Sequence, residues 1–192
     1  MIITAAILGL VLGLLMGGRW RSLLHKRFRL LPLLFSAFIL SWLLSVHFFS
    51  DWLAGSDHVW LWRSVIAALQ LAAMSFFLLV NRRKPGIWFI FAGGLLNGLV
   101  IIANGGRMPV GPAIDRFGEA AAAQINSVPH YFTASGHEPL LFLADLYPVW
   151  TFGTYMVSLG DFLIAAGVLW LGLYMSRPVR RKNRAAVSQL TS

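Results

Sequence analysis

The sequence of 192 residues contains no cysteine, and charged residues make up only 12% of it. The missing cysteines exclude disulfides, thiolate nucleophiles and metal or iron–sulfur sites with thiolate ligands. The charged share is about half of that in an ordinary soluble domain. Hydrophobic residues make up 58% of the sequence. This composition predicts an integral membrane protein.

Several apolar runs are long enough to cross a bilayer as a helix, which takes roughly 17–25 residues. The runs are continuous rather than alternating, so they lack the pattern of barrel strands. We predict an all-α fold, a polytopic transmembrane helical bundle that forms one integral membrane domain over residues 1–192. The five predicted spans lie at residues 2–18, 30–49, 59–80, 87–103 and 158–176.

The first run has no basic residues before it, which favours a retained helix over a signal peptide. It carries a glycine at every fourth residue, a pattern that lets two helices approach closely. In the fourth run the amide side chain of Asn97 lies among small residues, a pattern that also favours helix packing. The residues expected to pack helices together are Gly9, Gly13, Gly17, Gly94, Asn97 and Gly98.

The distribution of charge predicts the orientation of the helices. Thirteen of the sixteen Lys and Arg residues lie in segments 19–29, 82–84 and 177–184, on one side of the five spans. The positive-inside rule makes that side cytoplasmic. The N-terminus is then outside, and the basic tail 177–192 lies in the cytoplasm. The seven acidic residues all fall on the outer side: Asp51, Asp57, Asp115, Glu119, Glu138, Asp145 and Asp161.

A formal net charge of +9 would suggest nucleic acid as the partner of a soluble protein. In a membrane protein, topology and contact with anionic headgroups explain the basic segments without such a partner. We therefore expect the lipid bilayer as the surroundings, a lipid or a partner transmembrane helix as the ligand, and no nucleic acid.

An extracytoplasmic segment, residues 104–157, separates the last two spans and is too long for a simple connection. Residues 113–125 are predicted to form a short amphipathic helix. Residues 139–150 are apolar but too short to span, so they are either re-entrant or interfacial. Non-helical backbone at membrane depth persists only beside protein or a water-filled cavity. We therefore predict an outward-facing cavity lined by residues 104–161.

The start of this segment is a candidate ligand-binding site. Asn104, Gly105, Gly106 and Arg107 can hold an anion through backbone N–H groups and the guanidinium. The same Asn and Gly residues also have the pattern of an ordinary helix end. Arg107 is harder to explain in that way, because it is a lone cation near the outer interface.

Three aspartates are candidate catalytic residues. Asp161 is the acidic member of a capping-box pattern with Ser158, a role that does not exclude a catalytic one. Asp115 favours the start of its short predicted helix. Asp145 lies inside an apolar stretch, where a carboxylate must pair, take up a proton or meet water.

No metal site is predicted and no cofactor can be assigned. The sequence contains no HExxH pattern, and no span carries two central histidines that would ligate haem. A site built from His130, His137, Glu138 and an aspartate is the remaining metal alternative.

The segments Asn104–Val110, Leu143–Asp145 and Ser158–Asp161, the last ahead of a final helix, form a pattern with an NGGRMP signature. This pattern resembles an uncharacterised family of small bacterial polytopic membrane proteins, a domain of unknown function. The likeness covers nearly the whole chain. It implies the same topology and a place in the bacterial cytoplasmic membrane, but no activity.

A second resemblance is to lipoprotein signal peptidases, which are intramembrane aspartyl enzymes. Their motif G-N-x-x-D-R looks like Gly111–Arg116, and their motif F-N-x-A-D looks like Val157–Asp161. This likeness would imply that Asp115 and Asp161 form a dyad that activates water at the outer face. The asparagine of each motif is replaced here, by proline and by serine, which places the dyad in doubt.

Two functions follow as alternatives. The first is a binding, accessory or assembly protein whose outer cavity holds a lipid, a small molecule or a partner helix. The second is an intramembrane aspartate-dependent hydrolase that acts on a lipid-linked or membrane-anchored substrate. A small transporter is disfavoured, because five spans give no even inverted repeat. Whether the protein is an enzyme is not decided by its sequence.

Overall fold

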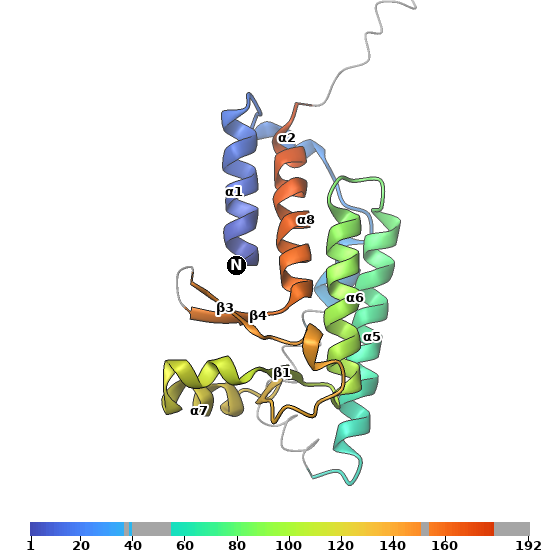
Figure 1. Ribbon diagram of the computed structural model, residues 1–192. Helices are drawn as coiled ribbons and strands as arrows, with labels where there is room; N and C mark the ends of the chain where they lie inside the picture. Colours follow the sequence, from blue (N-terminus) through green and yellow to red (C-terminus); the bar gives the residue numbers. More distant parts are fainter. Residues whose placement is uncertain (37–38, 40–54, 151–153, 179–192) are drawn as a thin grey trace, which may run out of the picture.

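The computed structural model of the protein describes residues 1–36, 39, 55–150 and 154–178 (Figure 1). The protein is mostly helical. Helices α1, α8, α6 and α5 lie side by side in that order, so the last helix packs between the first and the two from the middle of the chain. The bounds of the helices in the bundle are α1 (Ile2–Leu15), α2 (Arg21–His25), α5 (Val59–Val80), α6 (Ile87–Ala103) and α8 (Leu159–Ser176).

Three predicted spans agree closely with observed helices. α5 and α6 have the predicted bounds, and α8 begins one residue after Ser158, which is its N-cap. α1 ends before Gly18, because Gly17 adopts a left-handed φ of 88° that ends the helix. The predicted span at 30–49 lies mostly outside the described residues. α5 and α8 are long and apolar enough to cross a membrane, whereas α1 and α6 are shorter apolar helices.

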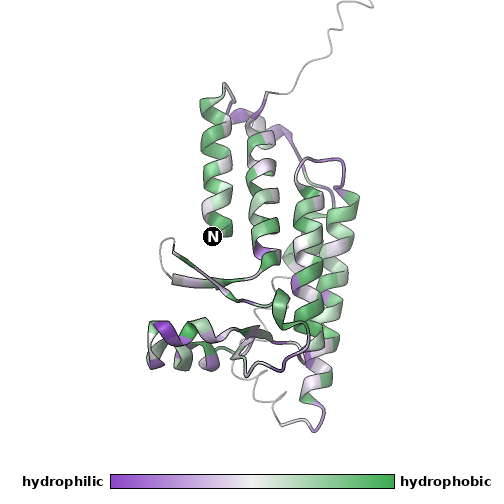
Figure 2. Cartoon of the chain, in the orientation of Figure 1, coloured by the Kyte–Doolittle hydropathy of each residue, from purple (hydrophilic) through white to green (hydrophobic). Residues whose placement is uncertain are grey.

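The helices of the bundle are apolar along most of their length (Figure 2). Many of their large apolar side chains are exposed. Only 11% of the residues in the apolar part of α5 are buried, and 22% of those in α8. The core helix of a soluble protein would be buried over most of its length. Apolar surface of this extent would drive association in water. It is the surface that a lipid-facing helix presents.

Glycines set how closely α8 packs against its two neighbours. A Cβ atom on Gly9 of α1 would collide with the backbone of Leu169 on α8. On the other side, a Cβ atom on Gly160 of α8 would lie only 2.6 Å from the carbonyl oxygen of Gly93 on α6. Backbones this close leave no room for side chains between them. Both contacts of α8 therefore require glycine.

Of the other glycines expected to pack helices, two face a neighbouring helix and two face open space in the described structure. Gly13 lies against α8, and Gly98 lies against the Leu71 side chain of α5. A Cβ atom on Gly17 or Gly94 would meet no atom within 4 Å in the part of the chain that the structure describes. Gly13 and Gly98 therefore lie at helix contacts, while a packing role for Gly17 and Gly94 stays a prediction.

The described residues between 104 and 158, called the end cap below, gather at the end of the bundle where α5 and α8 begin and α6 ends (Figure 1). The end cap joins α6 through a cluster in which Val100, Met108 and Ala144 are buried together. The described elements of the end cap are β1 (Met108–Val110), η1 (Pro112–Phe117), α7 (Glu119–Ser127), β2 (Tyr131–Thr133), η2 (Leu141–Leu143), β3 (Tyr147–Trp150) and β4 (Thr154–Val157).

β1 is buried at the centre of a small sheet. It pairs in parallel with β2, with Met108 opposite Tyr131. On its other edge an isolated parallel bridge joins Val110 to Asp145. β3 and β4 form a separate antiparallel pair. The pairing of β1 brings together three segments that are far apart in the sequence.

Two predictions for the end cap were wrong. The fold is not all-α, because the described part of this region contains four short strands. Pro109 and Pro112 prevent a helix where β1 forms. The single helix predicted at 113–125 is divided into η1 and α7 by Gly118, whose φ of 89° turns the chain between them. The apolar piece at 139–150 forms η2 and β3. Its depth in a membrane stays a prediction.

Candidate functional site around Asp145 and Asp161

The first turn of α8 is closed by a capping box. The amide of Asp161 donates to Ser158 Oγ at 3.0 Å, and the amide of Ser158 donates to Asp161 Oδ2 at 3.1 Å. Ser158 is fully buried. The two bonds satisfy backbone donors that a helix start otherwise leaves unpaired. The predicted capping role of Asp161 is therefore present.

Asn97 of α6 completes this network from the neighbouring helix. Its Nδ2 donates to Asp161 Oδ1 at 2.9 Å, and Ser158 Oγ donates to Asn97 Oδ1 at 2.8 Å. Both carboxylate oxygens of Asp161 are therefore engaged. Asn97, which was predicted to pack helices together, therefore links an interior position of α6 to the first turn of α8.

Asp145 is held against β1 by its main chain. Its amide donates to the carbonyl oxygen of Pro109 at 3.2 Å, and its carbonyl accepts the amide of Gly111 at 2.9 Å. The residue is only 6% exposed, and its neighbours Ala144 and Val110 are almost completely buried. Its Oδ1 atom is buried with no hydrogen-bond partner among the described residues. A buried polar atom of this kind calls for a specific explanation.

The surroundings of Asp145 favour its neutral form. Burial, and then the charge of Asp161, raise the pKa of the Asp145 carboxyl to about 8. A carboxyl with this pKa holds its proton at neutral pH. Partial burial and the charges of Asp145 and Asp161 also raise the pKa of Tyr131. Tyr131, Asp145 and Asp161 therefore lie close enough for their charges to interact, a grouping that the sequence did not indicate for Tyr131.

The segment that begins at Asn104 forms the end of α6. The amide of Gly106 donates to the carbonyl of Ile101 at 2.8 Å, which is the six-residue closure of a helix that ends in left-handed glycines. Asn104 Nδ2 donates to the carbonyls of Val100 and Pro139, at 2.8 and 2.9 Å. These contacts fix the start of the end cap on α6.

Three of the four backbone N–H groups that were expected to hold an anion, those of Asn104, Gly106 and Arg107, donate hydrogen bonds inside the protein. The amides of Gly106, Arg107 and Met108 all donate to carbonyl groups of the chain. The Arg107 side chain donates from Nη2 to the Tyr131 carbonyl and lies over the ring of Phe132, with its carbon Cζ 5.2 Å from the ring centre. Its Nε is buried and has no partner in the described part of the chain. Burial and the nearby Arg63 lower its pKa.

The remaining candidate residues lie apart from this cluster. Asp115 is exposed on η1. Glu138 closes a turn by accepting hydrogen bonds from Ser135 and Gly136, and these bonds lower the pKa of Glu138 to about 2. Among the described residues, no three His, Asp or Glu side chains are grouped so that they could hold a metal ion.

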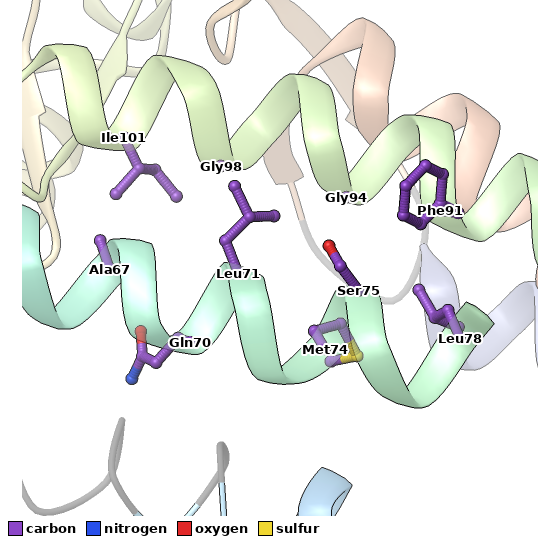
Figure 3. Close-up of a pocket in the computed structure, with 10 residues that line it drawn as sticks. All are labelled: Ala67, Gln70, Leu71, Met74, Ser75, Leu78, Phe91, Gly94, Gly98 and Ile101. Carbon is purple, nitrogen blue, oxygen red and sulfur yellow. The ribbon is translucent and has the colours of Figure 1, made fainter. Parts of the chain in front are cut away.

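Three cavities lie within the bundle rather than in the end cap. One of about 240 Å³ lies between α5 and α6, where Leu71 points toward Gly98 and Met74 and Phe91 lie nearby (Figure 3). A second, of about 290 Å³, has an apolar lining of side chains from residues 28–34, α5, α6 and α8. A third, of about 480 Å³, lies at the end of α5. Residues 104–161 line none of these three, so the candidate site rests on the Asp145 carboxyl itself.

Comparison with known proteins gives a family but no activity. Residues 25–173 match a family of unknown function, DUF5317. An uncharacterized protein of Thermotoga maritima is 30% identical over 110 residues, which are 56% of this chain. Those residues cover 62% of that relative, so the chain spans less than two thirds of its length. No solved structure matches. Because the matched residues make up most of the sequence, the chain belongs to the DUF5317 family of unknown function.

Proposed function

We propose that the chain is a single multi-pass domain in the bacterial cytoplasmic membrane, with five spans, an outer N-terminus and a cytoplasmic C-terminus. The apolar surfaces of α5 and α8 support the bilayer as the surroundings. The end cap carries four of the seven acidic residues, while the basic segments at 19–29 and 82–84 lie at the other end of the helices. The positive-inside rule then places the end cap outside.

Within this orientation, the protein binds a ligand at the outer face through Asp145. The observation that carries this proposal is the buried Oδ1 atom of Asp145, which has no partner among the described residues. An unsatisfied buried polar atom costs about 1–3 kcal/mol. A ligand that supplies a hydrogen bond recovers that cost. The polar group of a lipid or of a partner transmembrane helix meets this requirement at the outer interface.

The positions of the other two candidate aspartates favour binding over hydrolysis. Asp161 uses both carboxylate oxygens to cap α8 and to hold Asn97. Asp115 is exposed on η1, so the dyad suggested by the likeness to signal peptidases has no buried partner on that side. Asp161 is therefore a structural carboxylate in this proposal, and Asp145 is the binding one.

An aspartate-dependent hydrolase remains the second candidate, with Asp145 and Asp161 as its pair. One observation favours it. The pKa of Asp145 is raised to about 8, in part by the charge of Asp161. Two carboxyls whose environments separate their pKa values can supply an acid and a base. In that case the substrate is lipid-linked or anchored in the membrane.

Native mass spectrometry separates the two candidates. The full chain and its Asp145→Ala variant are purified from bacterial membranes in mild detergent, with Asp115→Ala as the exposed control. A binding protein retains a non-covalent adduct that Asp145→Ala loses, because alanine removes the Oδ1 acceptor. In a hydrolase, the substitution of Asp145 would remove a catalytic carboxyl. The variant would then accumulate uncleaved substrate and show an adduct that the wild type lacks. Equal adducts on all three proteins contradict both candidates.

A further inference from the structure

The cavity at the end of α5 combines positive charge with apolar surface. It has a volume of about 480 Å³, and its lining is Arg29, Phe76, Leu79, Val80, Arg82 and Arg83. All three arginines are exposed. The described acidic residues lie within the end cap or near the starts of α5 and α8, at the opposite end of the helices, so no carboxylate of the described residues neutralises this group. A ligand of this cavity must be both anionic and apolar.

A buried amide holds the arginines together. Asn81, which is 3% exposed, accepts the amide of Arg29 at 3.0 Å and donates to the carbonyl of Arg29 at 2.9 Å. It also donates to the carbonyl of Phe77 in the last turn of α5, at 2.9 Å. These three bonds fix Arg29 beside Arg82, although the two are far apart in the sequence. The charge cluster is therefore positioned by the fold.

The nearby lysines serve the protein itself. Lys26 donates to the carbonyls of Tyr174 and Arg177 at the end of α8. The Lys84 ammonium lies 5.1 Å from the ring centre of Phe28. The basic groups left facing the cavity are arginines, whose planar guanidinium binds phosphate through two parallel hydrogen bonds.

The apolar part of the cavity continues along α5. Phe76 is 55% exposed and Leu79 36%, and Leu69, two turns earlier, is 60% exposed. These residues follow the helical spacing that puts side chains on one face. From Val80 to Leu69 the helix rises about 16 Å at 1.5 Å per residue. That is close to one leaflet of a hydrocarbon core roughly 30 Å thick.

We propose that this cavity binds an anionic glycerophospholipid of the inner leaflet. Its phosphate lies among the three arginines, and an acyl chain lies along the exposed face of α5. The assignment rests on the proposed orientation, which places this end of α5 at the cytoplasmic surface. It is a second site, at the opposite end of the bundle from Asp145.

The test measures binding of phosphatidylglycerol to the purified full chain in detergent, by native mass spectrometry and by the melting temperature. The pocket variant is Arg29→Lys with Arg82→Lys and Arg83→Lys, and the control is Arg19→Lys with Arg21→Lys and Arg27→Lys. Lysine keeps the charge and the topology signal but loses the planar fork. We expect about tenfold weaker binding in the pocket variant, the effect of losing one charge-assisted hydrogen bond. The control binds as wild type does.

Three results overturn the lipid site: equal weakening in both variants, equal binding of phosphatidylethanolamine, or full competition by inorganic phosphate, which would identify a free anion as the ligand. A C-terminal topology reporter is measured in the same strains. A reporter outside the cell contradicts the proposed orientation. A cytoplasmic reporter without selective phosphatidylglycerol binding contradicts the lipid site alone.

Discussion

Asn97 donates a hydrogen bond from Nδ2 to Oδ1 of Asp161 at 2.9 Å, and so joins the inside of α6 to the first turn of α8. The same amide accepts the Ser158 hydroxyl. One side chain in an apolar helix thus holds the start of the last helix in place. The end cap enters α8 at this point, since Ser158 is the N-cap of the helix.

Replacing Asn97 by alanine is expected to lower the free energy of unfolding by about 1–3 kcal/mol, because it leaves polar atoms of Asp161 and Ser158 without partners. Chemical unfolding in detergent measures this. A double-mutant cycle with Asp161→Ala is expected to give a coupling energy of about 0.5–3 kcal/mol. Additive effects of the two substitutions would contradict the link between the helices.

The glycine contact between α1 and α8 gives a second prediction. Gly9→Leu is expected to lower stability by about 1–3 kcal/mol, because the side chain must push the backbone of Leu169 away. Gly94→Ala is the control, since a Cβ atom there meets nothing within 4 Å in the described chain. Alanine favours a helix over glycine by about 0.5–1 kcal/mol. The control is therefore neutral or stabilising, and equal loss at both positions would contradict this packing.

Glu138 gives a prediction on pH. Its pKa, lowered to about 2 chiefly by the hydrogen bond from the Ser135 amide, lies below the ordinary value of about 4.3. The carboxylate therefore stabilises the turn above the ordinary pKa, and this contribution is lost as the pH falls through about 2. NMR titration of the Glu138 carboxyl carbon measures the midpoint. Ser135→Ala removes only one of the three hydrogen bonds, so it raises the midpoint in part. A wild-type midpoint at the ordinary value would contradict the turn.

The helices could be predicted from sequence because their signals are local. An apolar run, a glycine-rich end and a Ser-x-x-Asp start fix the bounds of α5, α6 and α8 within one residue. The capping role of Asp161 follows from the same local pattern. The helix contacts of Gly9 and Gly13 lie in the stripe that the fourfold spacing indicated.

The end cap could not be predicted, because its contacts join distant segments. β1 has three residues, too few to show a periodic pattern, and its partners lie more than 20 residues away in the sequence. The burial of Asp145 depends on its bridge to Val110, which no local signal indicates. The left-handed φ of Gly118 divides a stretch that composition alone makes helical. Tyr131 enters the candidate site through β2 and was missed for the same reason.

The central claim is that Asp145 is a buried carboxyl that keeps its proton at neutral pH. Its folded pKa of about 8 lies above the ordinary value of about 3.9. The folded state then binds one more proton than the unfolded state between these values, so the stability of the wild type falls as the pH rises through that window. Asp145→Asn is neutral at every pH and does not have this dependence.

The most direct measurement is the free energy of unfolding of wild type, Asp145→Asn and Asp115→Asn from about pH 4 to about pH 9, the window in which the linkage operates. We expect the stability of Asp145→Asn relative to wild type to rise steadily with pH and to level off above about pH 8, while Asp115→Asn follows wild type. A difference between Asp145→Asn and wild type that is constant with pH would show that Asp145 is already charged, and would contradict the site proposed here.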